Sequence, residues 1–304
     1  MKRSRTGAAI LVIVLLVIGV MAISSFVSLM GDTEDANSSW GDLFFDRGNK
    51  IGVVTLKGTL ITCDETLKQL KKFRKKSSVK AIVIRINSPG GTVAPAQEIY
   101  REIEKTKKKK PVVASMETIG TSAAYYVASP TDRIVCSQGT ITGSIGVIMV
   151  MAEVHKLIDK IGVGVNIIKA GKYKDIGSGV RPLTDEERKI LETFAAEIHE
   201  QFITDVAKGR TGKITLEQVK TIADGRFFTG EKAKDLGLVD TIGNFYDAVK
   251  IAADLGGVKT EPELLYPEKK WDDFLDVFLE SVSSAIVTKL PQQTRFDQVA
   301  PAIR

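Results

Sequence analysis

Residues 79–91 read VKAIVIRINSPGG, and this stretch decides the fold class. Six of the eight residues from Val79 to Ile86 are apolar, so the strand they form has no polar face. Strands of that kind are buried on both sides and are typical of parallel sheets covered by helices. The turn Ser88-Pro89-Gly90-Gly91 then stops the strand and leaves the backbone free of side chains. We therefore predict an α/β domain with a glycine turn at the carboxyl end of a buried strand.

Strand-like and helix-like segments alternate on either side of this stretch. The predicted strands are short apolar runs at 51–56, 79–86, 111–115, 133–136 and 163–169. The predicted helices between them cover 66–76, 94–107, 122–128 and 153–161. Alternation at this spacing indicates right-handed β-α-β units and hence an α/β fold.

A long helix opens the carboxyl-terminal half of the chain. Thr184-Asp-Glu-Glu187 is a capping box, in which the Thr184 oxygen and the Glu187 carboxylate satisfy each other's backbone amides. Gly209 ends the helix. Apolar residues recur at helical spacing between these points and form one stripe: Leu191, Phe194, Ala195, Ile198 and Phe202. Shorter helices are predicted at 216–223, 229–235 and 244–255.

The amino terminus predicts a membrane anchor. Residues 8–30 contain no charged side chain, and a membrane-spanning helix needs about 20 apolar residues. Lys2, Arg3 and Arg5 precede this run and are expected to stay in the cytoplasm, so that the rest of the chain lies outside. The alternative is a secretory signal cleaved near Ala22-Ile23-Ser24. The predicted organisation is a cytoplasmic terminus at 1–7, an anchor at 8–30, a linker at 31–49, one globular domain at 50–256 and a tail at 257–304.

Two features of the tail and the charge pattern bear on partners. The tail carries an acidic amphipathic helix at 271–282, which we expect to pack against the domain or a sister subunit. The net charge of +6 comes largely from basic runs at 68–80 and 105–110, interpreted as a solvated helix face and a helix end. Neither run has the interleaved aromatic residues of a base-stacking surface, which argues against nucleic-acid binding.

Cys63 and Cys136 are too few for a disulfide framework, and Cys136 ends an apolar strand as a small core residue.

Ser122 is the candidate nucleophile. It precedes Ala123 and Ala124 at the predicted start of a helix, where free amides and the macrodipole favour developing negative charge. The plain alternative is that Ser122 only caps the helix. The amides of Gly91 and Ala123 would make a two-donor oxyanion hole, with each donor worth about 10²–10³ in rate. The glycine turn could equally be an ordinary tight turn.

A serine nucleophile needs a base, and the chain offers few histidines. His155 and His199 both lie inside predicted helices, which argues against a Ser-His-Asp triad. A lysine serves as a base only if burial lowers its pKa from the usual value of about 10.4. Lys169, Lys172 and Lys174 lie in one glycine-punctuated loop, and their spacing does not rank them.

Five motifs of the chain resemble those of the signal peptide peptidase A family in its short, single-domain form. That family belongs to the serine–lysine peptidases related to the Clp protease proteolytic subunit and the crotonases. The matching motifs occur in family order and span about residues 50–250: IRINSPGG at 84–91, GTSAAYY at 120–126, TITGSIGV at 140–147, GKYKDI at 171–176 and ADGRFFTG at 223–230. The combination is specific, although each motif alone is weak.

The resemblance implies a role for each site residue. It makes Ser122 the nucleophile, Lys174 the general base, and Ser144 the residue that orients the lysine amine. Gly91 and Ala123 would supply the oxyanion-hole amides. Many relatives have Ser-Gly-Gly where this chain has Ser122-Ala123-Ala124, so a methyl group narrows the site beside the nucleophile.

The resemblance also implies a crotonase/Clp-protease-like α/β domain of repeated β-β-α and β-α-β units, preceded by one transmembrane helix. The expected activity is that of a membrane-anchored, extracytoplasmic serine endopeptidase that degrades remnant signal peptides. A homo-oligomeric ring is expected, with neighbouring subunits completing each other's sites and with no metal or cofactor. Two alternatives stay open: an acyl-CoA-processing enzyme on the same fold, and a non-catalytic membrane-anchored scaffold.

Overall fold

The computed structural model describes residues 49–267. The predicted cytoplasmic terminus at 1–7, the anchor at 8–30 and the tail helix at 271–282 lie outside the described residues, as does the linker up to residue 48. Within 49–267, none of the helices combines the length and the apolar character that crossing a membrane requires.

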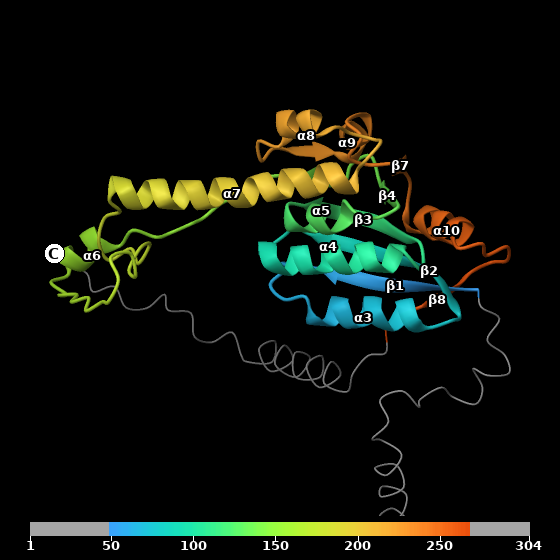
Figure 1. The fold of residues 1–304 in the computed structure, drawn as a ribbon, viewed down its shortest axis with the longest axis horizontal. Helices are drawn as coiled ribbons and strands as arrows, with labels where there is room; N and C mark the ends of the chain where they lie inside the picture. The colour runs from blue at the N-terminus through green and yellow to red at the C-terminus, as the bar shows by residue number, and fades with distance from the viewer. Residues whose placement is uncertain (1–48, 268–304) are drawn as a thin grey trace, which may run out of the picture. The chain divides into compact units, whose positions relative to one another are not determined.

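Eight strands of the described chain form one sheet (Figure 1). Six of them lie in the order β6-β5-β3-β2-β1-β8, and β4 pairs with both β3 and β7. Their pairings are parallel except for β5 with β6, which is antiparallel. The strands are β1 (Lys50–Lys57), β2 (Val79–Ser88), β3 (Val112–Thr121), β4 (Arg133–Cys136), β5 (Ile141–Gly143), β6 (Phe227–Thr229), β7 (Thr241–Ile242) and β8 (Glu263–Leu265).

The predicted helices are confirmed, with boundaries within two residues of those expected. The capping box of Thr184 and Glu187 is present, and it starts a helix of 25 residues that ends at Gly209. The helices are α3 (Asp64–Lys75), α4 (Val93–Lys107), α5 (Ala123–Ala128), α6 (His155–Lys160), α7 (Asp185–Gly209), α8 (Leu216–Ile222), α9 (Gly230–Asp235) and α10 (Phe245–Leu255).

Both faces of the sheet are buried, which explains the nearly continuous apolar run of β2. Ile82, Ile84 and Ile86 face the larger core, which includes residues of α3, α4 and α5. Ala81 and Val83 face a second core built with α10. The α/β class predicted from residues 79–91 is confirmed. Cys136 lies in the larger core, and both cysteines are buried and free.

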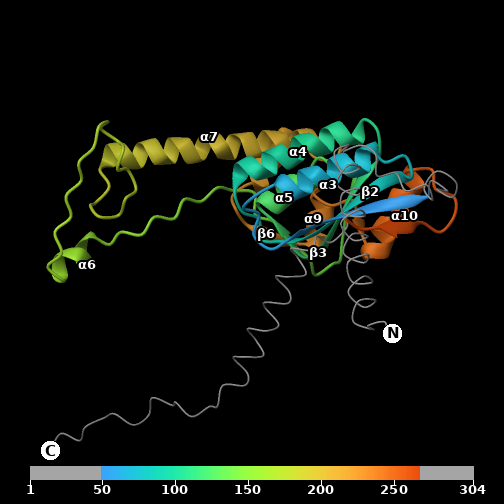
Figure 2. The same ribbon diagram turned by 90° about the horizontal axis from the view of Figure 1, so that it is seen from below.

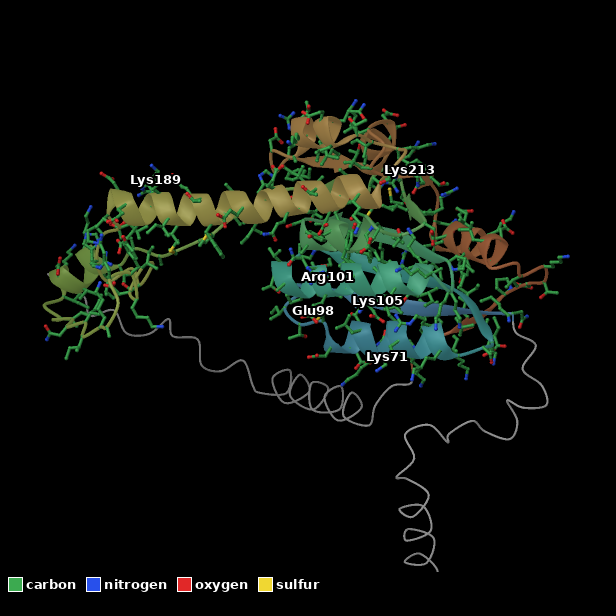
Figure 3. All side chains as sticks on the ribbon, viewed as in Figure 1. Lys71, Glu98, Arg101, Lys105, Lys189 and Lys213 are labelled. Carbon is green, nitrogen blue, oxygen red and sulfur yellow. The ribbon has the colours of Figure 1, made fainter. Side chains whose placement is uncertain are left out.

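The two basic runs lie on the outer surface of α3 and at the end of α4. Figure 3 shows Lys71 on α3 and Lys105 on α4, and both side chains are exposed. The predicted solvated helix face is therefore confirmed. Lys110 differs from the rest of its run, because its amine is partly buried and donates to the carbonyls of Phe73, at 2.7 Å, and Lys76.

The segment between β5 and α7 differs from the prediction. Apart from α6, residues 144–184 contain no regular helix or strand. The strand predicted at 163–169 is wrong, since this segment pairs with no strand in the described chain and Ile168 is fully exposed. Figures 1 and 2 both place this segment at the amino-terminal end of α7, away from the sheet. An alternating apolar pattern does not form a strand without a partner strand.

Helix α7 buries apolar side chains only in its carboxyl-terminal part. Phe202, Ile203 and Val206 are buried, and Phe202 stacks on Tyr126 of α5 with ring centroids 4.6 Å apart. Phe194, from the same predicted apolar stripe, is 52% exposed. Leu191, Ala195 and Ile198 are half-buried, so the described chain covers this part of the stripe only partly.

Candidate active site

Ser122 lies at the junction between β3 and α5, directly after Thr121. Its backbone has φ 53° and ψ −125°, a conformation that non-glycine residues seldom adopt. Its amide donates to the Gly143 carbonyl at 2.9 Å, which holds the junction in place. The Ser122 side chain makes no capping hydrogen bond, so the interpretation as a simple helix cap is wrong. A sharp turn between strand and helix instead presents the hydroxyl, which is partly exposed.

The glycine turn packs directly against this junction. A Cβ atom on Gly90, whose φ is +103°, would lie 2.8 Å from the Ser122 Cβ and 2.9 Å from the Ala123 nitrogen. A Cβ on Gly91 would lie 2.0 Å from the Leu60 carbonyl oxygen. Neither position admits a side chain. The interpretation of this turn as an ordinary tight turn omits the feature that requires both glycines, namely contact with the nucleophile and with Leu60.

The backbone amides of Gly91 and Ala123, the two predicted oxyanion donors, make no hydrogen bond within the described residues. Leu60 forms a parallel bridge with Gly91, in which the Leu60 amide donates to Gly90 and Thr92 donates back to Leu60, both at 2.8 Å. In such a bridge the amide of Gly91 itself points the other way, and it has no hydrogen-bond partner within residues 49–267. Ala123 is the first residue of α5, whose first-turn amides have no carbonyl within the helix to bond. Both predicted donors therefore lack a hydrogen-bond acceptor among the described residues.

Ser144 lies beside Ser122 through the pairing of β3 with β5. Thr121 pairs with Gly143, so the two serines directly follow paired residues. Ser144 also has a positive φ, 52°, and its amide donates to the Arg226 carbonyl at 2.8 Å. The motif at 223–230 thus has a structural role, because it supports the residue predicted to orient the base.

The structure separates the three candidate lysines. Lys169 bonds Asp175, and Lys172 bonds Glu186 at 2.6 Å, an ion pair that holds the pKa of Lys172 above its usual value. The Lys174 amine has no hydrogen bond or ion pair with any described residue, and this side chain is exposed. Its loop lies at the amino-terminal end of α7 (Figure 2), and no hydrogen bond joins it to Ser122 within residues 49–267. One chain alone does not bring Lys174 to the nucleophile.

The remaining candidates do not form a site. His155 lies in α6 and His199 in α7, and neither is hydrogen-bonded to Ser122 within residues 49–267. No group of three or more His, Cys, Asp and Glu side chains in the described chain could hold a metal ion. Sequence reasoning missed the contacts of Gly90 with Ser122, and it missed Arg181, which binds the residue following Lys174. The sequence can suggest that a glycine adopts a backbone conformation closed to other residues, but it does not reveal which residue packs against that glycine.

The fold and site can be compared with known proteins. Residues 104–259 match the model of peptidase family S49, which is about half of the chain. The chain belongs to peptidase family S49. "Putative protease slr0021" of Synechocystis sp. is 42% identical over 69% of this chain and 75% of its own length. The chloroplastic serine protease SPPA of Arabidopsis thaliana is 32% identical over 76% of this chain. A mutant of ClpP1 from Listeria monocytogenes matches 68% of this chain and 98% of its own, at 18% identity and a TM-score of 0.45.

Membership of family S49 makes the chain a serine peptidase and confirms the family indicated by the five motifs. Lengths differ between the relatives, however. The chain spans three quarters of the Synechocystis protein but only 35% of the Arabidopsis protease.

Proposed function

We propose that this chain is a serine endopeptidase that uses a Ser122–Lys174 dyad. The observation that carries the proposal is the backbone of Ser122, held at φ 53° against Gly90 of the glycine turn and directly before the free amide of Ala123. A strained residue persists only where its surroundings over-determine it, and such residues cluster at active sites. The serine peptidase family supplies the reaction class.

The reaction follows from these groups. The neutral amine of Lys174 takes the proton of the Ser122 hydroxyl as its oxygen attacks the peptide carbonyl carbon. The negative charge that develops on the carbonyl oxygen is stabilised by the amides of Gly91 and Ala123. The protonated Lys174 amine then gives its proton to the leaving amine, and the C–N bond breaks to leave an acyl-enzyme. Water, deprotonated by the same lysine, hydrolyses the ester and restores Ser122.

The dyad would form between neighbouring subunits of a ring. Two observations support this: Lys174 makes no hydrogen bond with Ser122 of its own chain, and the segment that precedes it exposes apolar residues. Ile148, Val150 and Ile168 are 86%, 87% and 101% exposed. A second subunit would cover these residues and carry the base to the nucleophile of its neighbour. Ser144 would then receive the amine by a hydrogen bond.

The cellular setting of the proposal comes from the sequence. The uncharged run at 8–30 would anchor the chain, with residues 1–7 in the cytoplasm and the peptidase domain outside. Extended apolar peptides, such as remnant signal peptides, would be the substrates, as the resemblance to signal peptide peptidase A implies.

The test is hydrolysis of a fluorogenic apolar peptide by the full-length protein in detergent. Ser122→Ala and Lys174→Ala should each lower kcat by at least about 10³-fold, because both groups act in the same step. Lys189→Ala, at an exposed lysine of α7, is the matched control and should retain kcat within a few-fold. A Lys174→Ala variant with the activity of wild type would refute the dyad. A wild-type protein that neither hydrolyses the peptide nor reacts with a serine-directed phosphonate would favour the scaffold alternative.

A further inference from the structure

The residues on both sides of Lys174 are tied to the first turn of α7. Lys172 donates to Glu186 at 2.6 Å, and the Tyr173 hydroxyl donates to the same carboxylate. On the other side, Asp175 accepts hydrogen bonds from Arg181. Lys174 is thus the one residue of the stretch 172–175 whose side chain is left without a partner among the described residues.

Arg181 joins two carboxylates in one arrangement. Its Nε and Nη2 donate to the two Asp175 oxygens at 2.8 and 2.9 Å. Its Nη1 and Nη2 donate to the two Glu187 oxygens at 2.8 and 2.5 Å. Glu187 in turn accepts the Thr184 amide at 3.0 Å within the capping box. A continuous chain of hydrogen bonds therefore runs from the start of α7 to the residue beside Lys174.

This cluster differs from an ordinary surface ion pair. Surface pairs contribute little because water competes for both partners. Here the side chains of Asp175 and Glu187 are only 7% and 4% exposed, and each meets the guanidinium through two oxygens. The bonds from Arg181 hold the pKa of Asp175 well below its usual range and lower that of Glu187 to about 2. A planar guanidinium can serve two carboxylates in this way, whereas an ammonium group cannot.

The charge of Asp175 matters to a lysine base. A neighbouring carboxylate favours the charged form of a lysine, and so raises the pH at which its amine becomes a base. Arg181 and Lys169 both bind Asp175 and oppose that effect. The other ionisable groups on the loop and on the segments packed against it are Lys172, Tyr173, Glu186, Glu187, Glu153 and His155.

We propose that Arg181 is a positioning residue for catalysis: it fixes the Lys174 loop to α7 and neutralises the carboxylate beside the base. The inference rests on the proposed function, since it assigns Lys174 the role of base. Arg181 itself would touch neither substrate nor Ser122. Its removal should therefore change kcat and the pH profile but leave KM nearly unchanged.

The test separates geometry from charge with three variants. Arg181→Gln should lower kcat by about 100-fold, the order of effect of a misplaced catalytic group. It should also move the alkaline rise of kcat to higher pH, because Asp175 loses one of the two cations that bind it. Arg181→Lys keeps the positive charge but loses the planar guanidinium that binds both carboxylates. Its kcat should therefore fall, while its pH profile stays that of wild type. Adding Asp175→Asn to Arg181→Gln should restore the profile without restoring kcat.

The matched control is Arg188→Gln, an exposed arginine of α7 with no side-chain hydrogen bond or ion pair among the described residues. It should leave kcat, KM and the pH profile unchanged. Melting temperature and subunit number are measured for every variant. An Arg181→Gln protein with the wild-type pH profile, or one that loses only stability, would overturn the inference.

A second measurement keeps the inference independent of peptide hydrolysis. The rate at which acetic anhydride acetylates Lys174, followed by peptide mass spectrometry over pH 7–11, reports the titration of this amine directly. Arg181→Gln should move that titration to higher pH, and Arg188→Gln should not. If the wild-type protein proves inactive and Arg181→Gln still moves the Lys174 titration, the dyad is wrong and the electrostatic coupling is right. No movement would refute the coupling, whatever the activity.

Discussion

Ser122 and Ser144 both have a positive φ, 53° and 52°, and no other non-glycine residue of the described chain does. Such conformations cost on the order of 1–3 kcal/mol each. The two are held by hydrogen bonds from their own amides, to Gly143 and Arg226 respectively. The two strained serines each follow one of two paired strands. Strained residues cluster at active sites, so this pair is more typical of a catalytic site than of a hydrophobic core.

Gly90→Ala should abolish activity by displacing the nucleophile. Its Cβ would lie 2.8 Å from both the Ser122 Cβ and the Thr121 carbonyl oxygen, and its φ of +103° is unfavourable for alanine. We expect kcat to fall by at least about 100-fold and the free energy of unfolding to fall by about 1–3 kcal/mol. Peptide hydrolysis and urea unfolding measure the two effects.

The control for this substitution is Gly212→Ala. Gly212 also has a positive φ, +81°, but no heavy atom lies within 4 Å of the added Cβ. It should therefore show the backbone cost without the loss of kcat. If Gly90→Ala retained the activity of Gly212→Ala, the close contact of the turn with Ser122 would have no catalytic importance.

Among the helices, the carboxyl-terminal end of α3 is capped from a distance by Lys110. Its amine donates to the carbonyls of Phe73 and Lys76, and burial, together with nearby Lys80, lowers its pKa to about 8. The unfolded chain has the ordinary lysine pKa of about 10.4, so between pH 8 and 10.4 it binds more protons than the folded chain. Lys110 should therefore make the protein more stable as the pH rises through this window.

We predict that the free energy of unfolding of wild type, relative to Lys110→Met, increases by about 1–3 kcal/mol from pH 7.5 to pH 10.5. Urea unfolding at four pH values measures the difference. Lys108→Met, at an exposed lysine of the same run, should show no such trend. A constant difference between wild type and Lys110→Met would mean that the amine keeps its ordinary pKa in the folded protein.

The elements show what the sequence could and could not predict. The strands at 51–56 and 79–86 and the capping box at Thr184 were predictable, because burial on two faces and reciprocal capping are local patterns. The strand predicted at 163–169 is wrong because the alternating residues Val163, Val165 and Ile167 form a strand only when another strand pairs with them. The described part of one chain provides no such strand, and these side chains are exposed. The Lys174 site was only partly predictable for the same reason: the family resemblance proposes Lys174 as the base, but no pattern in the sequence predicts what surrounds it.

At the scale of the whole molecule, apolar exposure is concentrated in one segment. Between residues 148 and 168, ten large apolar side chains are 37–101% exposed, and Phe194 of α7 adds to them. Contiguous exposed apolar surface of this kind marks an interface. The segment directly precedes the loop that carries Lys174, so an assembly that buries the one would also position the other.

Assembly through this segment predicts complementation between two inactive variants. If Ser122 of one subunit works with Lys174 of its neighbour, random co-assembly of Ser122→Ala and Lys174→Ala subunits makes about one quarter of the sites intact. Mixed rings should then regain roughly 25% of wild-type kcat per site, whereas a dyad within one chain would regain none. Adding Ile168→Glu to both variants should abolish the recovery by placing a charge in the interface, and Tyr246→Glu, at a residue 72% exposed on α10, should not. Light scattering reports assembly beside the peptide assay. If full rings form and no hydrolysis is recovered, Lys174 acts with the Ser122 of its own chain and not with that of a neighbour.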